Sequence, residues 1–128
     1  MSQIVRTLTV IPLEAAADHS AKEGYFVELA LGKASVCNAA TDVPFGLILD
    51  GENTGGNDSV AVCGGNAGSV RVKATAAVTK GTFGQLAADG SVIADSGAGA
   101  RVLPCLFLED GAANELVEAI LVLPLSKS

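Results

Sequence analysis

The chain has 128 residues and a mass of 12.8 kDa, the size of one ordinary domain, with 49% hydrophobic but only 17% charged residues. This composition excludes intrinsic disorder, which needs low hydrophobicity, and argues against a coiled coil, which would be rich in charged residues. The net charge of −6, the scattered basic residues and the lack of tryptophan argue against nucleic acid as a partner.

Mean hydropathy is high at +0.45, and few charges with much apolar surface favour a chain that covers part of itself with neighbouring subunits. No apolar run approaches the ~20 residues that a membrane helix needs, so no membrane partner is expected. The first ten residues contain no apolar core of signal-peptide length, which argues against export. Three widely spaced cysteines, Cys37, Cys63 and Cys105, favour neither a disulfide framework nor a zinc site. We expect buried thiols in a protein made in a reducing cytoplasm.

Turn signals every 8 to 12 residues, between short segments rich in Val, Leu and Ile, predict an all-β fold. We expect a small β-barrel or paired-sheet domain. Leu13 to Ala21 is alanine-rich and is expected to form a helical turn or a loop, and Asp89-Gly90 is expected to turn a hairpin. The expected strands are Ile4–Ile11, stopped by Pro12, then Tyr25–Leu31, Ala34–Cys37, Phe45–Leu49, Ser59–Cys63, Val70–Val72, Phe83–Ala87, Ser91–Ala94, Val102–Glu109 and Glu115–Leu123.

The two halves of the chain resemble each other. At an offset of 57 residues, Gly24, Phe26, Leu29 and Ala30 match Gly81, Phe83, Leu86 and Ala87, and at an offset of 60 the segment from Pro44 to Gly51 matches that from Pro104 to Gly111. This similarity predicts pseudo-repeats at about 22–63 and 80–123 within a single β domain, 22–128, and the alternative is chance similarity between glycine-rich hairpins. The expected core residues are Phe26, Leu29, Phe45, Phe83, Leu86 and Phe107.

Residues that could carry chemistry are few. His19 is the only histidine, so no catalytic triad can be built, and its polar neighbours indicate a solvated loop residue. Cys63 is followed by two glycines but has no nearby histidine base, so its thiol would stay mostly protonated. The acidic loop 50–58 offers oxygen ligands for Ca²⁺, but it fits the EF-hand pattern badly, and a flexible hairpin loop is the default interpretation. No catalytic, cofactor-binding or metal-ligating residues are assigned.

The second half of the chain resembles the small capsid decoration, or cement, proteins of tailed bacteriophages. A "Gly-x-Val-x-Val" strand, a hairpin containing "Gly-x-x-Leu" and an acidic-apolar last strand follow each other in the order typical of that family. The resemblance covers roughly residues 24 to 122, and Pro104-Cys105-Leu106 departs from it where the family often has glycine. The segments that carry it are Gly68–Ala74, Val78–Phe83, Leu86–Gly90, Val102–Glu109 and Glu115–Leu121.

The resemblance implies a non-enzymatic structural protein of the virion, without a cofactor. Family members are small β domains, often homotrimers, that sit on the outer capsid surface and stabilise contacts between major capsid protein subunits. We therefore expect a protein assembled in the host cytoplasm and displayed on the virion, with the major capsid protein and itself as partners. Two alternatives stay open: a soluble β-barrel that binds a small ligand or Ca²⁺, and a cysteine-dependent enzyme.

Residues 1–21 are expected to form an N-terminal arm, or a first strand plus a loop. Alternating β-formers between Ser2 and Leu13 could add a strand to the sheet of a neighbouring protein. The competing interpretation is an ordinary first strand inside the domain. The candidate capsid-contact residues of the arm are Ser2, Ile4, Val5, Arg6, Thr7, Leu8, Thr9 and Val10.

Overall fold

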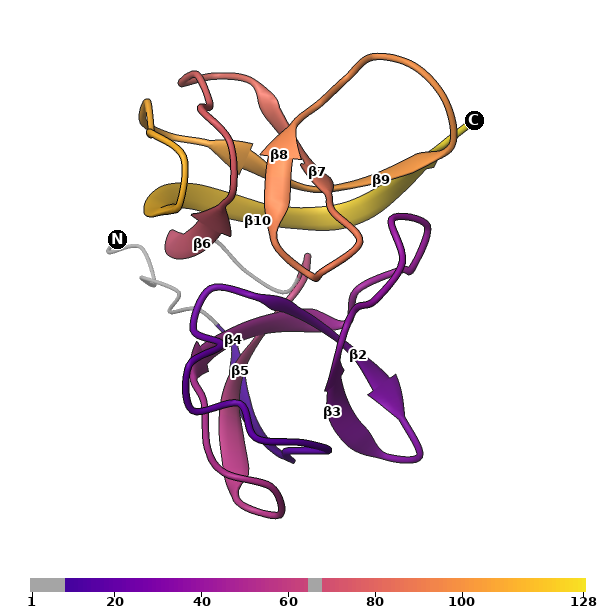
Figure 1. Ribbon diagram of the computed structural model, residues 1–128, viewed down its shortest axis with the longest axis vertical. Coiled ribbons are helices and arrows are strands. Elements are labelled where there is room, and N and C mark those ends of the chain that lie inside the picture. Colours follow the sequence, from indigo (N-terminus) through magenta and orange to yellow (C-terminus); the bar gives the residue numbers. More distant parts are fainter. Residues whose placement is uncertain (1–8, 65–67) are drawn as a thin grey trace, which may run out of the picture.

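The chain folds into two sheets stacked one above the other (Figure 1), and the expected all-β fold is confirmed. The computed structural model describes residues 9–64 and 68–128, and these ranges contain strands and loops but no helix. The strands are β1 (Val10–Glu14), β2 (Phe26–Ala30), β3 (Lys33–Val36), β4 (Gly46–Asp50), β5 (Asn57–Val62), β6 (Val70–Ala74), β7 (Phe83–Leu86), β8 (Val92–Ala94), β9 (Arg101–Phe107) and β10 (Glu115–Lys127).

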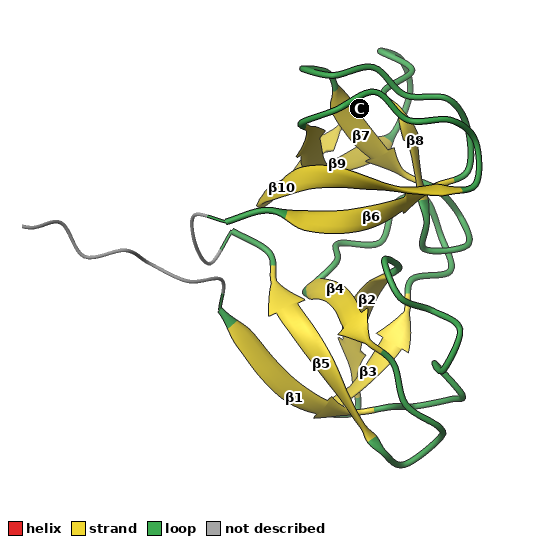
Figure 2. Ribbon diagram, turned by 90° about the vertical axis from the view of Figure 1, so that its left-hand side faces the viewer, coloured by secondary structure: helices red, strands yellow, loops and turns green. Residues whose placement is uncertain are grey.

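Strands β1 to β5, the first unit, form an open sheet in the order β1-β5-β4-β2-β3 (Figure 2). β2 and β3 form a hairpin that turns through Leu31 and Gly32, whose φ angles are 52° and 76°. Positive φ at both central residues is what a two-residue hairpin turn requires. The backbones at the ends of β1 and β3 are joined by one parallel bridge, between Ala15 and Ala34, and not by a ladder of strand pairing. The sheet therefore curls towards a barrel without closing.

Strands β6 to β10, the second unit, close into a barrel in the order β10-β6-β8-β7-β9. β7 and β8 form the hairpin expected at Asp89-Gly90, where Gly90 has a φ of 87°. The barrel closes where β6 and β8 pair in parallel at Ala74 and Val92. β10 pairs with both β6 and β9, and a register shift between Leu121 and Leu125 bends it.

The two units share one connectivity. In each, a hairpin (β2-β3 or β7-β8) pairs with the next strand, that strand pairs with the last, and the last pairs with the first. The parallel contact is also repeated, because the Ala16 N–H donates to the Ala34 carbonyl at 2.9 Å and the Thr75 N–H donates to the Val92 carbonyl at 3.0 Å. β1 and β6 belong to this shared pattern, so the repeating unit is longer than the segments 22–63 and 80–123.

Equivalent positions in the two units are defined better by strand pairing than by similarity of the amino-acid sequence. Both units carry a row of three cross-strand neighbours on the outer face of the sheet. These rows are Phe26, Leu47 and Ala61 on β2, β4 and β5, and Phe83, Leu106 and Ile120 on β7, β9 and β10. Leu106 therefore stands where Leu47 stands, an offset of 59 rather than the expected 60. The proline and Asp-Gly letters that suggested 60 do not occupy equivalent ladder positions.

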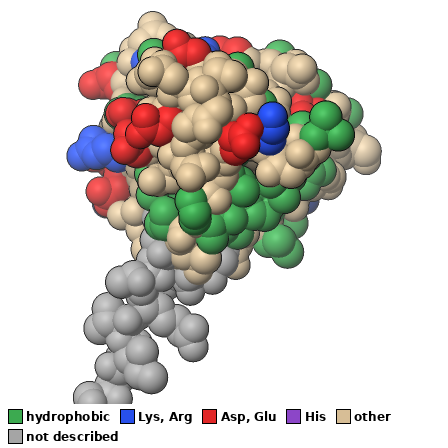
Figure 3. Space-filling view, turned by 90° about the horizontal axis from the view of Figure 1, so that it is seen from below, with side chains coloured by type: hydrophobic (Ala, Val, Ile, Leu, Met, Phe, Trp, Pro, Cys, Tyr) green, Lys and Arg blue, Asp and Glu red, His purple; other side chains and the backbone are tan. Residues whose placement is uncertain are grey.

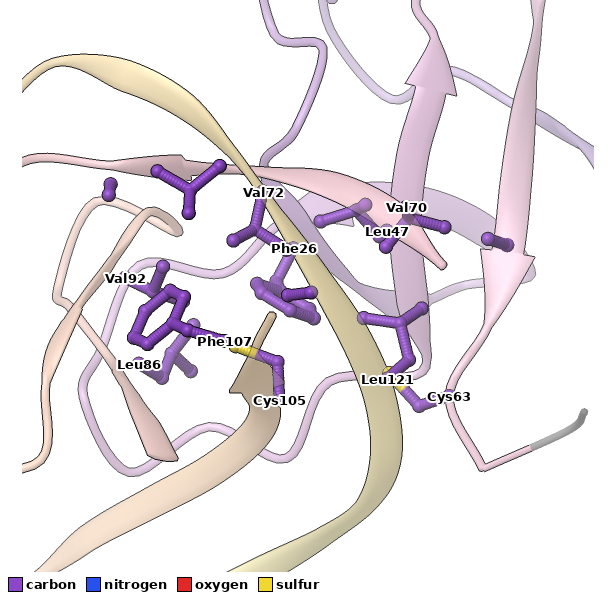
Figure 4. Packing of buried hydrophobic residues seen from close by; sticks show 14 of the residues in the cluster. Phe26, Leu47, Cys63, Val70, Val72, Leu86, Val92, Cys105, Phe107 and Leu121 are labelled. Atoms are coloured by element: carbon purple, nitrogen blue, oxygen red, sulfur yellow. The ribbon is translucent and has the colours of Figure 1, made fainter. Parts of the chain in front are cut away.

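Apolar side chains pack in two clusters. The smaller cluster fills the first unit and consists of Val27, Ala34, Ile48 and Val60, with Leu13, Val36 and Phe45 packed against it. The larger cluster fills the second unit and continues into the first, because Phe26, Leu47, Ala61 and Cys63 belong to it. Figure 4 shows the Phe26 ring beside Val72, Cys105 and Phe107 of the second unit. The two units are therefore joined by a shared core.

At one pair of equivalent interior positions, the larger residue and the glycine are exchanged between the two units. Val27 pairs with Gly46 in the first unit, and the equivalent pair in the second unit is Gly84 with Cys105. A methyl group on Gly84 would lie 2.6 Å from the Cys105 sulfur, and one on Gly46 would lie 2.6 Å from a methyl carbon of Val60. Neither interior therefore has space for a side chain at its glycine position.

Two of the expected core residues lie at the surface. Phe26, Leu86 and Phe107 are buried and Phe45 is partly buried, but Leu29 is 49% exposed and Phe83 is 38% exposed. The prediction for Leu29 and Phe83 is wrong because burial depends on what covers each unit. Leu86, the counterpart of Leu29, belongs to the core shared by both units, whereas the corresponding end of the first unit is uncovered.

The first strand also differs from expectation. Pro12 lies within β1 instead of ending a strand. The Thr9 carbonyl accepts a hydrogen bond from the Val62 N–H, so every second residue from Thr9 directs its backbone polar groups towards β5 and Pro12 directs its nitrogen away from that strand. An edge strand tolerates proline in this orientation. The segment 13–21 finishes β1 and continues as loop, without a helical turn.

Candidate interaction surface

His19 is buried, and the expectation of a solvated loop residue is wrong. It is only 2% exposed, and its Nδ1 lies 2.5 Å from Oδ2 of the fully buried Asp58 on β5. The second carboxylate oxygen of Asp58 accepts a hydrogen bond from the Glu52 N–H at 2.8 Å, and the His19 N–H donates to the Glu52 carbonyl, also at 2.8 Å. These bonds fasten the loop after β1 to the loop before β5. The sequence separates His19 from Asp58 by 39 positions, so polar neighbours gave no sign of the contact.

The acidic loop 50–58 uses its one buried carboxylate internally. Both oxygens of Asp58 already have protein partners, which leaves this group unsuited to complete a calcium site from the loop. Within residues 9–64 and 68–128 there is no group of three or more His, Cys, Asp or Glu side chains placed to hold a metal ion. The loop geometry therefore does not favour the calcium-binding alternative.

All three thiols are buried. Desolvation raises the pKa of Cys37, Cys63 and Cys105 to about 12 each. At neutral pH a thiol with such a pKa is ionised to about one part in 10⁵, and the thiolate is the form that reacts as a nucleophile. This arrangement gives no support to the cysteine-dependent enzyme.

A groove of about 400 Å³ follows the seam between the units. Ile48 and Leu49 of β4 form one wall, and Val70 and Leu116 of the second unit form the other. The groove is open to solvent, whereas small-molecule sites enclose most of their ligand. Its shape therefore does not favour the ligand-binding alternative.

Large apolar side chains instead gather on the outside of the protein. Seen from below, the end of the molecule formed by the first unit carries a broad area of hydrophobic side chains (Figure 3). On the second unit, the row of Phe83, Leu106 and Ile120 faces outward, with Phe83 exposed and the other two half-buried. Contiguous apolar surface of this kind marks protein contacts. The exposed large apolar residues are Val10, Leu29, Leu31, Val43, Phe83, Leu116, Leu123 and Leu125.

The candidate arm divides into two parts. Ser2, Ile4, Val5, Arg6, Thr7 and Leu8 lie outside the described residues. Val10 to Leu13 pair with β5, so this part belongs to the first sheet and the arm cannot extend to Leu13 as expected. Val10 is 45% exposed and adds to the apolar surface of the first unit.

No family model matches the chain, and no curated protein gives a significant match. Over residues 9–64 and 68–128 there is no helix long and apolar enough to cross a membrane. One feature of the sequence indicates the outward row. Phe83 and Gly84 are adjacent on β7, so the phenylalanine ring and the glycine, which has no side chain, lie on opposite faces of the strand. Which face would be covered was not readable from that alternation.

Proposed function

We propose that the protein is a structural component of a tailed-phage virion that decorates the outer capsid surface and stabilises contacts between major capsid protein subunits. The observation that carries this proposal is the distribution of side chains. His19 and Asp58 are buried and hydrogen-bonded to each other, and the three thiols are buried, while large apolar residues lie on the surface. Such a distribution supports a role in binding other proteins rather than in catalysis.

The resemblance to decoration proteins supports the same role. Gly68–Ala74 contains β6, the Leu86–Gly90 segment turns the β7-β8 hairpin, and Val102–Glu109 contains all of β9 except its first residue. The segments that carry the resemblance are therefore strands and turns of one closed barrel, not unrelated pieces of surface loop. The protein is proposed to act without a cofactor and as an oligomer of its own chain, with three copies expected.

Co-sedimentation with capsids tests this function. The probe is the expanded, undecorated capsid of a phage that encodes this chain, mixed with purified protein and pelleted through a density gradient. We expect saturable binding and capsids that resist heating or low salt better when decorated. Unbound protein at saturating capsid concentration would refute the proposal.

A pair of truncations tests the arm within the same assay. Deleting residues 2–8 leaves β1 complete, so this variant is expected to keep its melting temperature and bind capsids more weakly. Deleting residues 2–13 removes most of β1 and its pairing with β5, and this control is expected to unfold the first unit. Equal capsid binding by the wild type and the 2–8 deletion would remove the arm from the proposal and leave decoration itself standing.

A further inference from the structure

The contact between the two units uses unlike faces. The outer row of the first unit, Phe26, Leu47 and Ala61, is fully buried against the second unit. Two main-chain hydrogen bonds accompany it: the Lys73 N–H donates to the Gly24 carbonyl at 2.9 Å, and the Phe26 N–H donates to the Gly90 carbonyl at 2.8 Å. The covered part of the second unit is thus β6 together with the end of the barrel at the β7-β8 turn.

Glycines at equivalent positions in the two units have different surroundings, so the contact between the units is not repeated with their roles exchanged. A methyl group on Gly24 would lie 2.9 Å from the Lys73 nitrogen, and one on Gly90 would lie 2.6 Å from a methyl carbon of Val36. The counterparts of Gly24 and Gly90 are Gly81 and Gly32, and a methyl group on either would meet nothing within 4 Å. A two-fold arrangement would repeat each contact with the units exchanged. The units are therefore related head to tail.

A head-to-tail pair leaves one face of each kind uncovered. On the second unit the uncovered face is the outer row, in which Phe83 takes the place of Phe26, Leu106 that of Leu47 and Ile120 that of Ala61. The uncovered face of the first unit is the end at the β2-β3 turn, which points away from the second unit in Figure 1. There Leu29 is 49% exposed, although its counterpart Leu86 is fully buried.

We propose that these two uncovered faces bind each other between copies of this chain. The outer row of β7, β9 and β10 in one copy would cover β1 and the β2-β3 turn of the next, repeating the contact that joins the units within the chain. The main-chain bonds corresponding to those inside the chain would run from the Glu14 N–H to the Gly81 carbonyl and from the Phe83 N–H to the Gly32 carbonyl. Repetition of such a contact produces a closed ring or an open chain of copies.

Single aspartate substitutions test each face separately. Phe83→Asp places a charge in the outer row of the second unit, and Leu29→Asp places one at the uncovered end of the first unit. Val43→Asp is the matched control, because Val43 is 59% exposed on the loop before β4 and belongs to neither face. In sedimentation velocity, we expect the wild type and the control to self-associate. Each face variant should raise the dissociation constant at least about tenfold, as central interface residues do.

Mixing the two face variants distinguishes head-to-tail binding from any other self-association. Each variant keeps one intact face, so an equimolar mixture of Phe83→Asp and Leu29→Asp should form complexes of two copies and nothing larger. Circular dichroism of the monomers checks folding, and Phe83→Ser and Leu29→Ser replace any aspartate variant that does not fold. A wild type that stays monomeric at high micromolar concentration would overturn the proposal, as would a mixture that behaves like the separate variants. The proposal rests on the self-association that is part of the proposed function, and because the assay contains no capsid, its failure would leave the proposed binding to capsids standing.

Discussion

Alanine substitution of Phe26 and of Phe83 compares one position in two surroundings. The two residues begin the equivalent strands β2 and β7, and each is paired with a leucine of the neighbouring strand in the sheet, β4 or β9. Phe26 is fully buried in the core shared by the units, whereas Phe83 is 38% exposed. We expect Phe26→Ala to destabilise the protein much more than Phe83→Ala.

The expected magnitudes follow from burial. Truncating a fully buried phenylalanine costs about 3–5 kcal/mol, because transfer free energy is lost and a cavity remains. Complete burial of such a side chain is worth about 1.5–3 kcal/mol. Phe83 is roughly three-fifths buried, and water fills the space that the ring vacates, so its truncation should cost about 1–2 kcal/mol. The unfolding free energies of the two variants should therefore differ by about 2–3 kcal/mol.

Urea unfolding followed by circular dichroism measures this difference. The protein should be diluted until sedimentation shows monomers, because association between copies would add stability at Phe83 and reduce the contrast. The slope of free energy against urea must agree among the wild type and both variants for the values to be compared. Equal losses from Phe26→Ala and Phe83→Ala in monomers would refute the assignment of Phe26 to the contact between units.

Two further substitutions test the buried polar and thiol groups. Asp58→Ala leaves the buried His19 ring and the Glu52 N–H without their hydrogen-bond partner and should cost about 1–3 kcal/mol. Lys33→Ala, which breaks the half-exposed pair with Glu14, should cost less than about 1 kcal/mol in the same urea assay. Because burial raises the pKa of Cys63 from 9.0 to about 12, the unfolded state loses the thiol proton first and the unfolding free energy should fall as pH rises between those values. The Cys63→Ala variant should lack that part of the decline, up to about 1.4 kcal/mol per pH unit, and an identical pH slope in both proteins would contradict the burial of this thiol.

Strands and hairpin turns were predictable because their signals are local. Alternating apolar residues bounded by glycine and aspartate define β7, β8 and the turn at Asp89-Gly90 without reference to the rest of the chain. The effect of Pro12 is not local, because it depends on which side of β1 has a neighbouring strand. That neighbour, β5, begins more than 40 residues further along the chain.

Burial at the candidate surface could not be predicted in the same way. Phe26 and Phe83 stand in similar local sequence, and only the contact between units makes one core and leaves the other at the surface. The same holds for His19, because its partner Asp58 lies 39 positions further along the chain and local sequence does not indicate which residues meet. Long-range packing, not the alternation of residue types, decided these positions.

Similarity between the two units does not by itself explain why the exposed row on the second unit is apolar, and this favours a binding partner. Side chains at equivalent interior positions differ in size, because Val27 and Gly46 of the first unit correspond to Gly84 and Cys105 of the second. Equivalent positions in the two units therefore need not carry similar residues. A row that only faced water would be expected to carry polar residues on an antiparallel sheet. This row carries Phe83, Leu106 and Ile120, and Ile120 is larger than the Ala61 that it replaces. The second unit therefore has at its surface an apolar face with the same architecture as the one that holds the two units together.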